Sequence, residues 1–391
     1  MNQPNSNQCP ACRRPKITHW QNWVEASVTL FFPRFLTLLS KRLDRHFSSA
    51  LPKLFTALRL ARFENLTDEI KIEPRAKLFT TVARRNGAIV EILKTRFGYT
   101  DHFRITLNGQ THHFDSLPIA EFANERLATD IDDKKICKQI LRQGGFPVLP
   151  SRAFWFWQEK KALRFAEQIG FPVVVKPRAG SVARHVTTDI RNDVELSIAI
   201  DHANEFSPYF MVEKYLGNCF VHRATIIDGD FVACAKQLPA HVIGNGQDSI
   251  AKLMEQKNTD PRRDNKFYHA LSADESFLRG QALSMSSIPL AGQTVFLQKD
   301  PFMRYGGDIA EVTNEMHPDN KKLFLDIAKH FGLKVIGLDF MIKDISMSWR
   351  EQPCAVLEVN TVPCIEMHHY PIYGSPQDVA GEIFKMFKKY Y

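Results

Sequence analysis

The spacing of apolar and polar residues switches between helical and strand periods along most of the chain. Residues 74–85, PRAKLFTTVARR, have apolar side chains three and four positions apart, which predicts a helix, and AIVEIL follows an Asn-Gly pair as a strand. Alternating runs flank Asn108-Gly109 and Asp228-Gly229, which predicts two hairpins. Because helices and hairpin strands are mixed, we predict an α+β fold with largely antiparallel sheets.

The same patterns predict the later elements. We expect helices at DDKKICKQILRQGG, KALRFAEQIG, NDVELSIAIDHANEF, PDNKKLFLDIAKHFG and DVAGEIFKMFKKY, and strands at FPVVVKP, FMVEKYL, GLDFMIKDI and AVLEVN.

The composition is that of an ordinary soluble globular chain. With 391 residues, 44% of them hydrophobic and 24% charged, it is large enough to bury an extensive core. The run VTLFFPRFLTLLS is too short for a membrane span, contains Pro33 and Arg34, and lacks the layout of a secretory signal. Seven cysteines, an odd number, argue against a disulfide framework. We therefore expect a cytoplasmic protein without a membrane span.

Positive charge is concentrated at the N-terminus. Before residue 63 there are ten Lys or Arg against two acids, Glu25 and Asp44, an excess of eight that equals the net charge of +8 of the whole chain. A basic helical arm is thus expected to precede a neutral body. The arm either binds an acidic partner, a membrane surface or nucleic acid, or presents a solvated basic face while packing on the body or on a second subunit. We favour the packed arm, which allows a homodimer, and expect no nucleic-acid partner.

The arm opens with Cys9 and Cys12 in the segment CPAC. This spacing supplies half of a zinc site, and the other half would come from His19, His46 or another chain. The alternative is a frayed terminus with two reduced thiols.

Polar side chains interrupt two apolar strands near the C-terminus. Glu358 and Asn360 lie two positions apart in AVLEVN and share a face of the strand, and Asp339 lies in GLDFMI. Buried carboxylates are costly unless they are paired or bound to a cation, and carboxylate and amide oxygens are ligands that magnesium prefers. The pattern indicates a magnesium site, with a solvent-exposed sheet face as the alternative.

Lysines lie where phosphates could be held. Lys176 ends the valine run of FPVVVKPRAGS, where an ammonium beside a small-residue loop suits a phosphate, and a strand-end lysine in solvent is the alternative. Lys138, on a predicted helix, competes with Lys134 and Lys135 for such a role.

Taken in order, these segments resemble the ATP-grasp ligases, and in particular the branch that contains cyanophycin synthetase and the glutathione synthetase part of the bifunctional enzymes. The similar segments are DDKKICKQILRQGGFPVLP, FPVVVKPRAGSVARHVTTDI, MVEKYL, the insert RATIIDGDFVACAKQLPAHVIGNGQDSIAKLMEQKNTDPRR, YGGDIAEVTNEMHP, VIGLDFMI and LEVNTVP. Their common order is far more specific than any one of them.

The resemblance implies an ATP-grasp fold, in which two α+β lobes sandwich ATP. The expected domains are a basic helical arm at 1–62, a reduced pre-ATP-grasp α/β region at 63–125, the N-terminal lobe at 126–212, and the C-terminal lobe with the metal site at 213–391. The implied reaction phosphorylates a carboxylate to an acyl phosphate, which an amine attacks to give an amide. Amino acids or short peptides are the substrates that this branch implies.

The resemblance also assigns roles to individual residues. Lys138 and Lys176 would contact the α- and β-phosphates, and Glu213, with the backbone near Tyr215 and Leu216, would read the adenine. Two magnesium ions would be held by Asp339, Glu358 and Asn360. Arg223 would face the transferred phosphate, with an outward strand charge as the alternative.

The chain departs from the family at the Gly-rich loop. Residues 180–185 read GSVARH, so two glycines are lost that readily adopt positive φ, and we expect the loop to close differently. Ser181 and Arg184 are the candidate nucleotide contacts here, and His185 could add a cation. Asp264 and Cys364 also replace family glycines, and the acid expected to hold the ribose is missing near Cys219.

The substrate side is less specific. His368 and His369, with Glu366, lie where the family's acceptor pocket forms, and could receive an ammonium and act as base, or merely pack beside the site. Arg304 in FMRYGG is a candidate clamp for a substrate carboxylate. The rival functions are a nucleotide-binding protein without ligase turnover and a phosphotransferase of the same fold.

Overall fold

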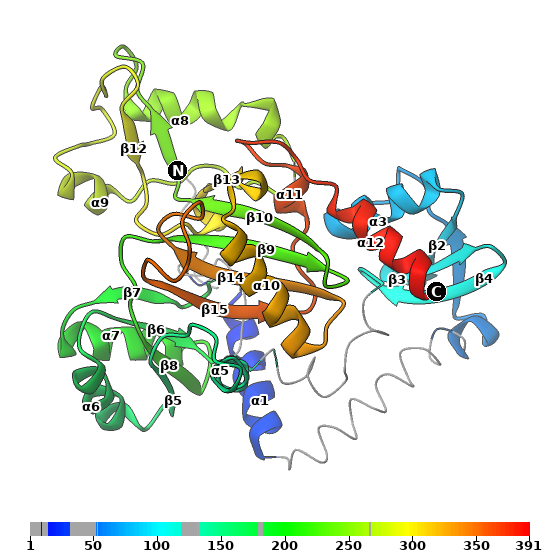
Figure 1. Cartoon of the computed structure of the whole chain (residues 1–391), viewed down its shortest axis with the longest axis horizontal. Coiled ribbons are helices and arrows are strands. Elements are labelled where there is room, and N and C mark those ends of the chain that lie inside the picture. Colours follow the sequence, from blue (N-terminus) through cyan, green and yellow to red (C-terminus); the bar gives the residue numbers. More distant parts are fainter. Residues whose placement is uncertain are drawn as a thin grey trace. The chain divides into compact units, whose positions relative to one another are not determined.

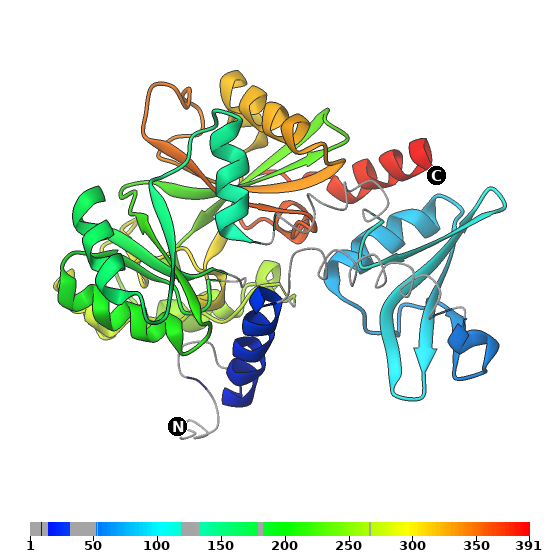
Figure 2. The same ribbon diagram turned by 90° about the horizontal axis from the view of Figure 1, so that it is seen from below.

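The chain was analysed as a computed structural model, which describes residues 9, 15–31, 52, 54–118, 131, 133–178, 183–265 and 267–391. It divides into two compact units (Figures 1 and 2). Unit 1 comprises Met1–His46, Glu125–Cys219 and Cys354–Val359, and unit 2 comprises Phe47–Asn124, Phe220–Pro353 and Asn360–Tyr391. Within the described residues, the helices are all too short or too polar to cross a membrane.

Unit 1 is built on an antiparallel sheet with strand order β5-β8-β6-β7. Helices α6 and α7 contact each other and both pack on the sheet (Figure 1). The apolar sides of these elements form one core, in which Val173, Val175 and Phe210 are fully buried. The elements are β5 (Ser151–Trp155), α6 (Glu159–Ile169), β6 (Val173–Pro177), β7 (Thr187–Ile190), α7 (Asp193–Asn204) and β8 (Tyr209–Lys214).

Three further elements contribute to unit 1: α1 (Lys16–Phe31), α5 (Lys134–Gln143) and most of β15 (Cys354–Asn360). The indole Nε1 of Trp23 in α1 donates a hydrogen bond to the carbonyl of Asn204, at 3.1 Å. Helix α1 of the basic arm therefore contacts α7 within unit 1. Cys12, His46 and Ser181 lie outside the described residues.

Unit 2 contains an N-terminal antiparallel sheet with strand order β1-β2-β3-β4. The predicted hairpin between β3 and β4 is confirmed, because Asn108 and Gly109 adopt φ values of 52° and 80°, as a tight two-residue turn requires. The elements are β1 (Ala61–Asn65), α3 (Pro74–Arg85), β2 (Ile89–Thr95), β3 (Gly98–Leu107) and β4 (Gln110–Asp115).

A second sheet of unit 2 contains strands in the order β13-β10-β9-β14, all antiparallel. The β9–β10 hairpin turns at Asp228-Gly229 as predicted, with φ values of 51° and 70°. Helix α10 packs on this sheet, and α12 contacts both β9 and α3 (Figures 1 and 2). The elements are β9 (Phe220–Ile227), β10 (Phe231–Leu238), β13 (Asp308–Glu311), α10 (Pro318–Phe331), β14 (Val335–Ile342), α11 (Glu366–His369) and α12 (Val379–Tyr390).

The insert between β10 and β13 folds on its own small core. Its elements are β11 (His241–Ile243), α8 (Ile250–Asn258), α9 (Glu275–Gly280) and β12 (Thr294–Phe296). The fully buried Asp308 pairs with Arg263 and with Lys257, the latter at 2.6 Å, so one carboxylate ties the DPRR segment to the end of the insert. Gly306 is required here because its φ is +88° and a Cβ would lie 2.5 Å from Leu271 Cα.

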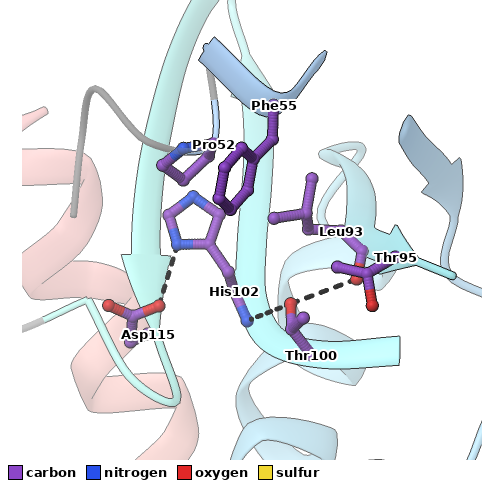
Figure 3. Close-up of a pocket in the computed structure, with 7 residues that line it drawn as sticks. All are labelled: Pro52, Phe55, Leu93, Thr95, Thr100, His102 and Asp115. Carbon is purple, nitrogen blue, oxygen red and sulfur yellow. Dashed lines mark hydrogen bonds and ion pairs between the residues drawn. The ribbon is translucent and has the colours of Figure 1, made fainter. Parts of the chain in front are cut away.

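A hollow of about 240 Å³ lies in the N-terminal part of unit 2 (Figure 3). The side chain of His102 points toward Asp115, with Nδ1 2.8 Å from a carboxylate oxygen. None of the site residues predicted from the sequence lines this hollow. Its lining is Pro52, Phe55, Leu93, Thr95, Thr100, His102 and Asp115.

We expect Phe79→Ala to lower the free energy of unfolding by about 3–5 kcal/mol, because a large side chain leaves a cavity. Phe79 is fully buried, and its ring centroid lies 5.4 Å from that of Phe114 and 6.1 Å from that of Phe387, so it joins α3 to β4 and α12. Urea unfolding of the full chain, followed by circular dichroism, measures the change. The control is Phe97→Ala, at a side chain that is 85% exposed, and equal stability of the two variants would contradict this packing.

Candidate active site

Two lysines share one buried carboxylate in unit 1. Lys138 comes from α5, Lys176 from the end of β6, and Glu213 from β8. Glu213 lies opposite Val174 in the strand pairing, so Lys176 is its diagonal neighbour on the same face of the sheet. Lys176 Nζ lies 2.5 Å from Glu213 Oε2, and Lys138 Nζ pairs with Oε1 of the same group. All three side chains are shielded from solvent, with exposures of 1% for Lys138, 2% for Glu213 and 11% for Lys176.

Burial and pairing shift the titration of this cluster in definite directions. Burial alone would raise the pKa of the Glu213 carboxyl, but attraction to Lys138 and Lys176 outweighs it, and the pKa is lowered. Burial lowers the pKa of Lys138 despite the attraction of Glu213. Burial would also lower the pKa of Lys176, but attraction to Glu213 and to Glu358 outweighs burial, so the pKa of Lys176 is raised. Glu213 is therefore held ionised.

A second layer of ion pairs surrounds the cluster in unit 1. Lys134 Nζ lies 3.2 Å from Glu358 Oε2, and Arg178 pairs with Asp133, the N-terminal cap of α5. The sequence offered Lys134, Lys135 and Lys138 as candidates for holding a phosphate. Of these, Lys138 is buried and Lys134 lies beside Glu358. The backbone of β15 is fixed near α5, because Lys138 Nζ also donates to the carbonyl of Val356, at 3.3 Å.

Unit 2 holds a second pair of predicted site residues. Arg223 and Asp339 are directly opposite in the β9–β14 pairing, and Arg223 Nε lies 2.6 Å from Asp339 Oδ1 while its Nη2 lies 3.1 Å from Oδ2. The turn after Asn360 lies close by, since a Cβ on Gly337 of β14 would come within 2.9 Å of Pro363 and 3.5 Å of Arg223. Arg223 thus points to the carboxylate beside it.

The predicted metal ligands are chemically suited to magnesium. Asp339, Glu358 and Asn360 offer oxygen donors, as magnesium prefers. Both carboxylates are already oriented by a basic residue, Asp339 by Arg223 and Glu358 by Lys134. The amide Nδ2 of Asn360 is buried and has no hydrogen-bond partner within the described ranges. Asp339 and Asn360 belong to unit 2 and Glu358 to unit 1.

Among the described residues, the Arg304 guanidinium uses only some of its hydrogen-bond donors. Its Nη2 donates to the hydroxyl of Tyr305, at 2.9 Å, and the guanidinium lies over the rings of Phe302 and Tyr305. Its Nε and Nη1 are buried and lack a hydrogen-bond partner among the residues that the structure describes. Unpaired guanidinium nitrogens are costly to bury, so an anionic ligand would stabilise this arrangement.

The two histidines of α11 differ in their surroundings. His368 is fully buried, with Nδ1 2.8 Å from Glu311 Oε2 and Nε2 2.9 Å from the hydroxyl of Thr225, so both nitrogens are engaged inside the protein. His369 is half-buried, and its Nε2 accepts a hydrogen bond from the backbone N–H of Ala380, at 3.1 Å. Burial lowers the pKa of His369, which keeps its ring neutral.

The glycine-poor loop keeps a glycine-like backbone where it is described. Ala183 and His185 adopt positive φ values of 50° and 52°, so the described end of the loop has this conformation without glycine. Arg184 lies half-buried between them. Tyr215 and Leu216 lie just after β8, which ends at Lys214, before the end of the expected strand FMVEKYL. The Tyr215 N–H donates to the carbonyl of Pro172, at 3.1 Å.

Sequence reasoning missed two features of these sites. It gave Glu213 only a part in adenine recognition, although the strand alternation in FMVEKYL, which puts Glu213 on the same face as Met211, could have suggested a partner for Lys176. It gave no role to Glu311, whose carboxylate lies beside His368, because nothing local in the sequence links residues 57 positions apart.

Comparisons with known proteins agree with the resemblance seen in the sequence. Residues 133–274 match the family described as carbamoyl-phosphate synthase L chain, ATP binding domain. Cyanophycin synthetase of Trichormus variabilis is 35% identical over 262 residues, which are 65% of this chain and 29% of that protein. The glutathione biosynthesis bifunctional protein GshAB of Pasteurella multocida is 26% identical over 368 residues, 88% of this chain and 46% of that protein.

The fold is likewise similar to a solved structure. A bifunctional glutathione synthetase from Pasteurella multocida superposes with a TM-score of 0.63 at 23% identity, over 82% of this chain and 44% of that one. The predicted α+β, largely antiparallel ATP-grasp fold is thereby confirmed. The chain spans less than half the length of these relatives.

We expect Glu213→Gln to lower the free energy of unfolding at neutral pH by about 3–5 kcal/mol, because it leaves two buried ammonium groups without their counter-charge. The folded-state pKa of Glu213 lies below its unfolded value of 4.5, so its contribution is complete above that pH and is lost as the pH falls through the folded pKa. Denaturant unfolding between pH 3 and 7 measures both effects. The matched control is Glu167→Gln, an exposed carboxylate on α6, and a Glu213→Gln protein as stable as this control would refute the assignment.

Proposed function

We propose that this chain, which has the ATP-grasp fold, is an ATP-dependent carboxylate–amine ligase that forms an amide bond through an acyl phosphate. Amino acids or short peptides are the proposed substrates, in keeping with the names of the relatives that it resembles. The observation that carries the proposal is the buried cluster of Lys138, Glu213 and Lys176, because it fixes two lysines on one ionised carboxylate at the end of strand β6, shielded from solvent.

Unit 1 is assigned the nucleotide. Phosphoryl transfer depends mainly on positioning and on neutralising charge, and two lysines fixed by a shared carboxylate supply both. Lys138 and Lys176 bind the α- and β-phosphates in this assignment, while Ser181 and Arg184 belong to the loop that covers them. Glu213 and the backbone at Tyr215 and Leu216 read the adenine.

Asp339, Glu358 and Asn360 are the residues that would hold magnesium, and we propose two ions. Bound magnesium supplies positive charge that neutralises phosphate oxygens during transfer. The protein's own part is to orient both carboxylates. Arg223 does so for Asp339, and it is the group that we assign to the transferred phosphate.

Unit 2 is assigned the organic substrates. The unpaired Nε and Nη1 of Arg304 fit a substrate carboxylate. Of the two histidines, His369 is the more accessible, because its ring is half-buried, whereas His368 is enclosed by Glu311 and Thr225. To accept a proton, His369 Nε2 must first release the N–H of Ala380. We therefore assign proton transfer to His369 and the positioning of α11 to His368.

The direct test measures phosphate release from ATP and magnesium across the twenty amino acids, singly and in pairs, with mass spectrometry of the products. A ligase requires a particular pair and gives a product whose mass is their sum less water. Release of ADP with a single phosphorylated substrate would instead reveal a phosphotransferase. Tight nucleotide binding without release, for amino acids and for dipeptides, would contradict ligase function with this substrate class.

With the substrates that the panel identifies, we expect Lys176→Ala to lower turnover by roughly 10²-fold or more, in the range for a lost charge that stabilises a transition state. The control is Lys135→Ala, which removes an exposed lysine from the helix that carries Lys138. Initial rates of phosphate release measure both variants. Unchanged turnover in Lys176→Ala would remove this lysine from the site.

We expect Arg304→Lys to raise the KM for the carboxylate substrate roughly 10- to 100-fold, because a lysine cannot replace the planar set of guanidinium donors. The KM for ATP should stay within a few-fold, which separates a substrate clamp from a nucleotide contact. Arg279→Lys, at an exposed arginine of unit 2, serves as the control. A rise confined to the KM for ATP would overturn the assignment.

A further inference from the structure

Three metal-binding side chains from distant parts of the sequence meet in unit 1. They are Cys9 near the start of the chain, His19 in α1, and His185 in the turn between β6 and β7. All three are buried, with 3%, 8% and 0% of their surface exposed, and their ligand atoms lie within 4.8 Å of one another. The proposed ligase reaction uses none of them.

The spacing within this cluster suits a tetrahedral zinc ion. With Zn–S near 2.3 Å and Zn–N near 2.0–2.1 Å, a sulfur and a nitrogen on one tetrahedral zinc are about 3.6 Å apart. Cys9 Sγ and His185 Nε2 are separated by 3.6 Å. A hydrogen bond between the thiol and the imidazole has a similar length. The Cys9 Sγ to His185 Nε2 distance is therefore compatible with both a hydrogen bond and a shared zinc ion, and these two atoms need not move apart to bind the metal.

His185 is oriented as zinc-binding histidines are. Its Nδ1 donates to the backbone carbonyl of His202, at 2.7 Å, which leaves Nε2 with the lone pair that faces Cys9. Its ring stacks on Phe206 with centroids 5.3 Å apart, and the ring of His19 meets both His185 and Phe206 edge-on. Phe206 thus forms an apolar wall that keeps the ligand atoms away from water.

The backbone of His185 supports the same reading. A non-glycine residue at positive φ costs about 1–2 kcal/mol and persists when its surroundings fix it. The φ of His185 is 52°, and that of Ala183 two residues earlier is 50°. A bond from His185 to a metal would hold this turn in place.

We propose that Cys9, His19 and His185 bind one zinc ion, which fastens the start of the basic arm and helix α1 to the turn after β6. Mixed sulfur and nitrogen donors select zinc over magnesium or calcium. On binding, the Cys9 thiol loses its proton to solvent and the thiolate forms the bond to zinc, while both histidines bind as neutral rings. Cys12 follows at the spacing of zinc-binding pairs and is the sequence's candidate for a fourth ligand, although it lies outside the described residues.

A rival arrangement would use the other nitrogen of His185. His185, His202 and Glu205 also lie close enough together to hold a metal, with Glu205 Oε2 3.8 Å from His185 Nδ1. That arrangement would break the hydrogen bond from Nδ1 to His202, and the side chain of Glu205 is 61% exposed. The cluster around Cys9 is favoured because it keeps that bond and is buried throughout.

The test measures the zinc content of the purified full chain by plasma mass spectrometry. We expect about one zinc per chain, falling below roughly one-tenth in Cys9→Ser and in His19→Gln. Two matched controls should keep their zinc: Cys219→Ser, at another cysteine of unit 1, and Glu205→Gln, which disables the rival arrangement. Loss of zinc from Glu205→Gln with retention in Cys9→Ser would overturn the proposal.

A second measurement on the unmodified protein guards against variants that fail to fold. After chelation and reloading with cobalt, the proposed site predicts the absorption of tetrahedral cobalt together with a thiolate-to-cobalt charge-transfer band. We also expect chelation to lower the melting temperature and added zinc to restore it. A chain that purifies without zinc and gives no thiolate band with one equivalent of cobalt would refute the site. These readouts are independent of ligase activity.

Discussion

The ion pairing of Lys138 and Lys176 with Glu213 is the constraint on which unit 1 depends. An ammonium removed from water costs several kcal/mol unless a counter-charge accompanies it, and here two ammonium groups share one carboxylate. The three side chains come from α5, β6 and β8, so the pairing holds a helix and two strands in register as well as satisfying charge. Burial lowers the pKa of Lys138, whereas attraction to Glu213 and to Glu358 raises that of Lys176, so Lys176 is the lysine whose positive charge the cluster holds more firmly.

In unit 2, too, buried charged side chains are paired with groups of opposite charge. Asp339 is paired with Arg223, His368 with Glu311, and Asp308 with Arg263 and Lys257, each in a largely buried setting. Pairs of this kind are weak evidence for stability, since their desolvation offsets much of their attraction. They do fix the direction in which each side chain points. Arg304 is different, because two of its nitrogens remain unsatisfied by the described protein, and this contrast is the reason to place a substrate anion there.

The sequence predicted the local structure well because the signals for it are local. The turns at Asn108-Gly109 and Asp228-Gly229 form as expected, since left-handed residues at adjacent positions specify a tight hairpin. The ordered motifs predicted the fold as well. What could not be predicted were contacts between distant segments: Glu213 between two lysines, Glu311 beside His368, and Cys9 beside His185, which are 176 residues apart. Such contacts are set by packing in three dimensions. The expectation that the glycine-poor loop closes differently stays a prediction, although propensity did not foresee positive φ at Ala183 and His185.

That loop shows how one backbone shape can be reached by two physical routes. Glycine adopts positive φ at little steric cost, but it also adopts other backbone conformations readily. His185 adopts positive φ at a steric cost that its contacts must offset. Those contacts are Phe206, the carbonyl of His202, and the cluster with Cys9 and His19. Arg184 lies between the two left-handed residues and so shares the turn that these contacts fix. Cys9 and His19, which lie beside this turn in space, come more than 160 residues earlier in the sequence, so the contacts at His185 are not encoded locally.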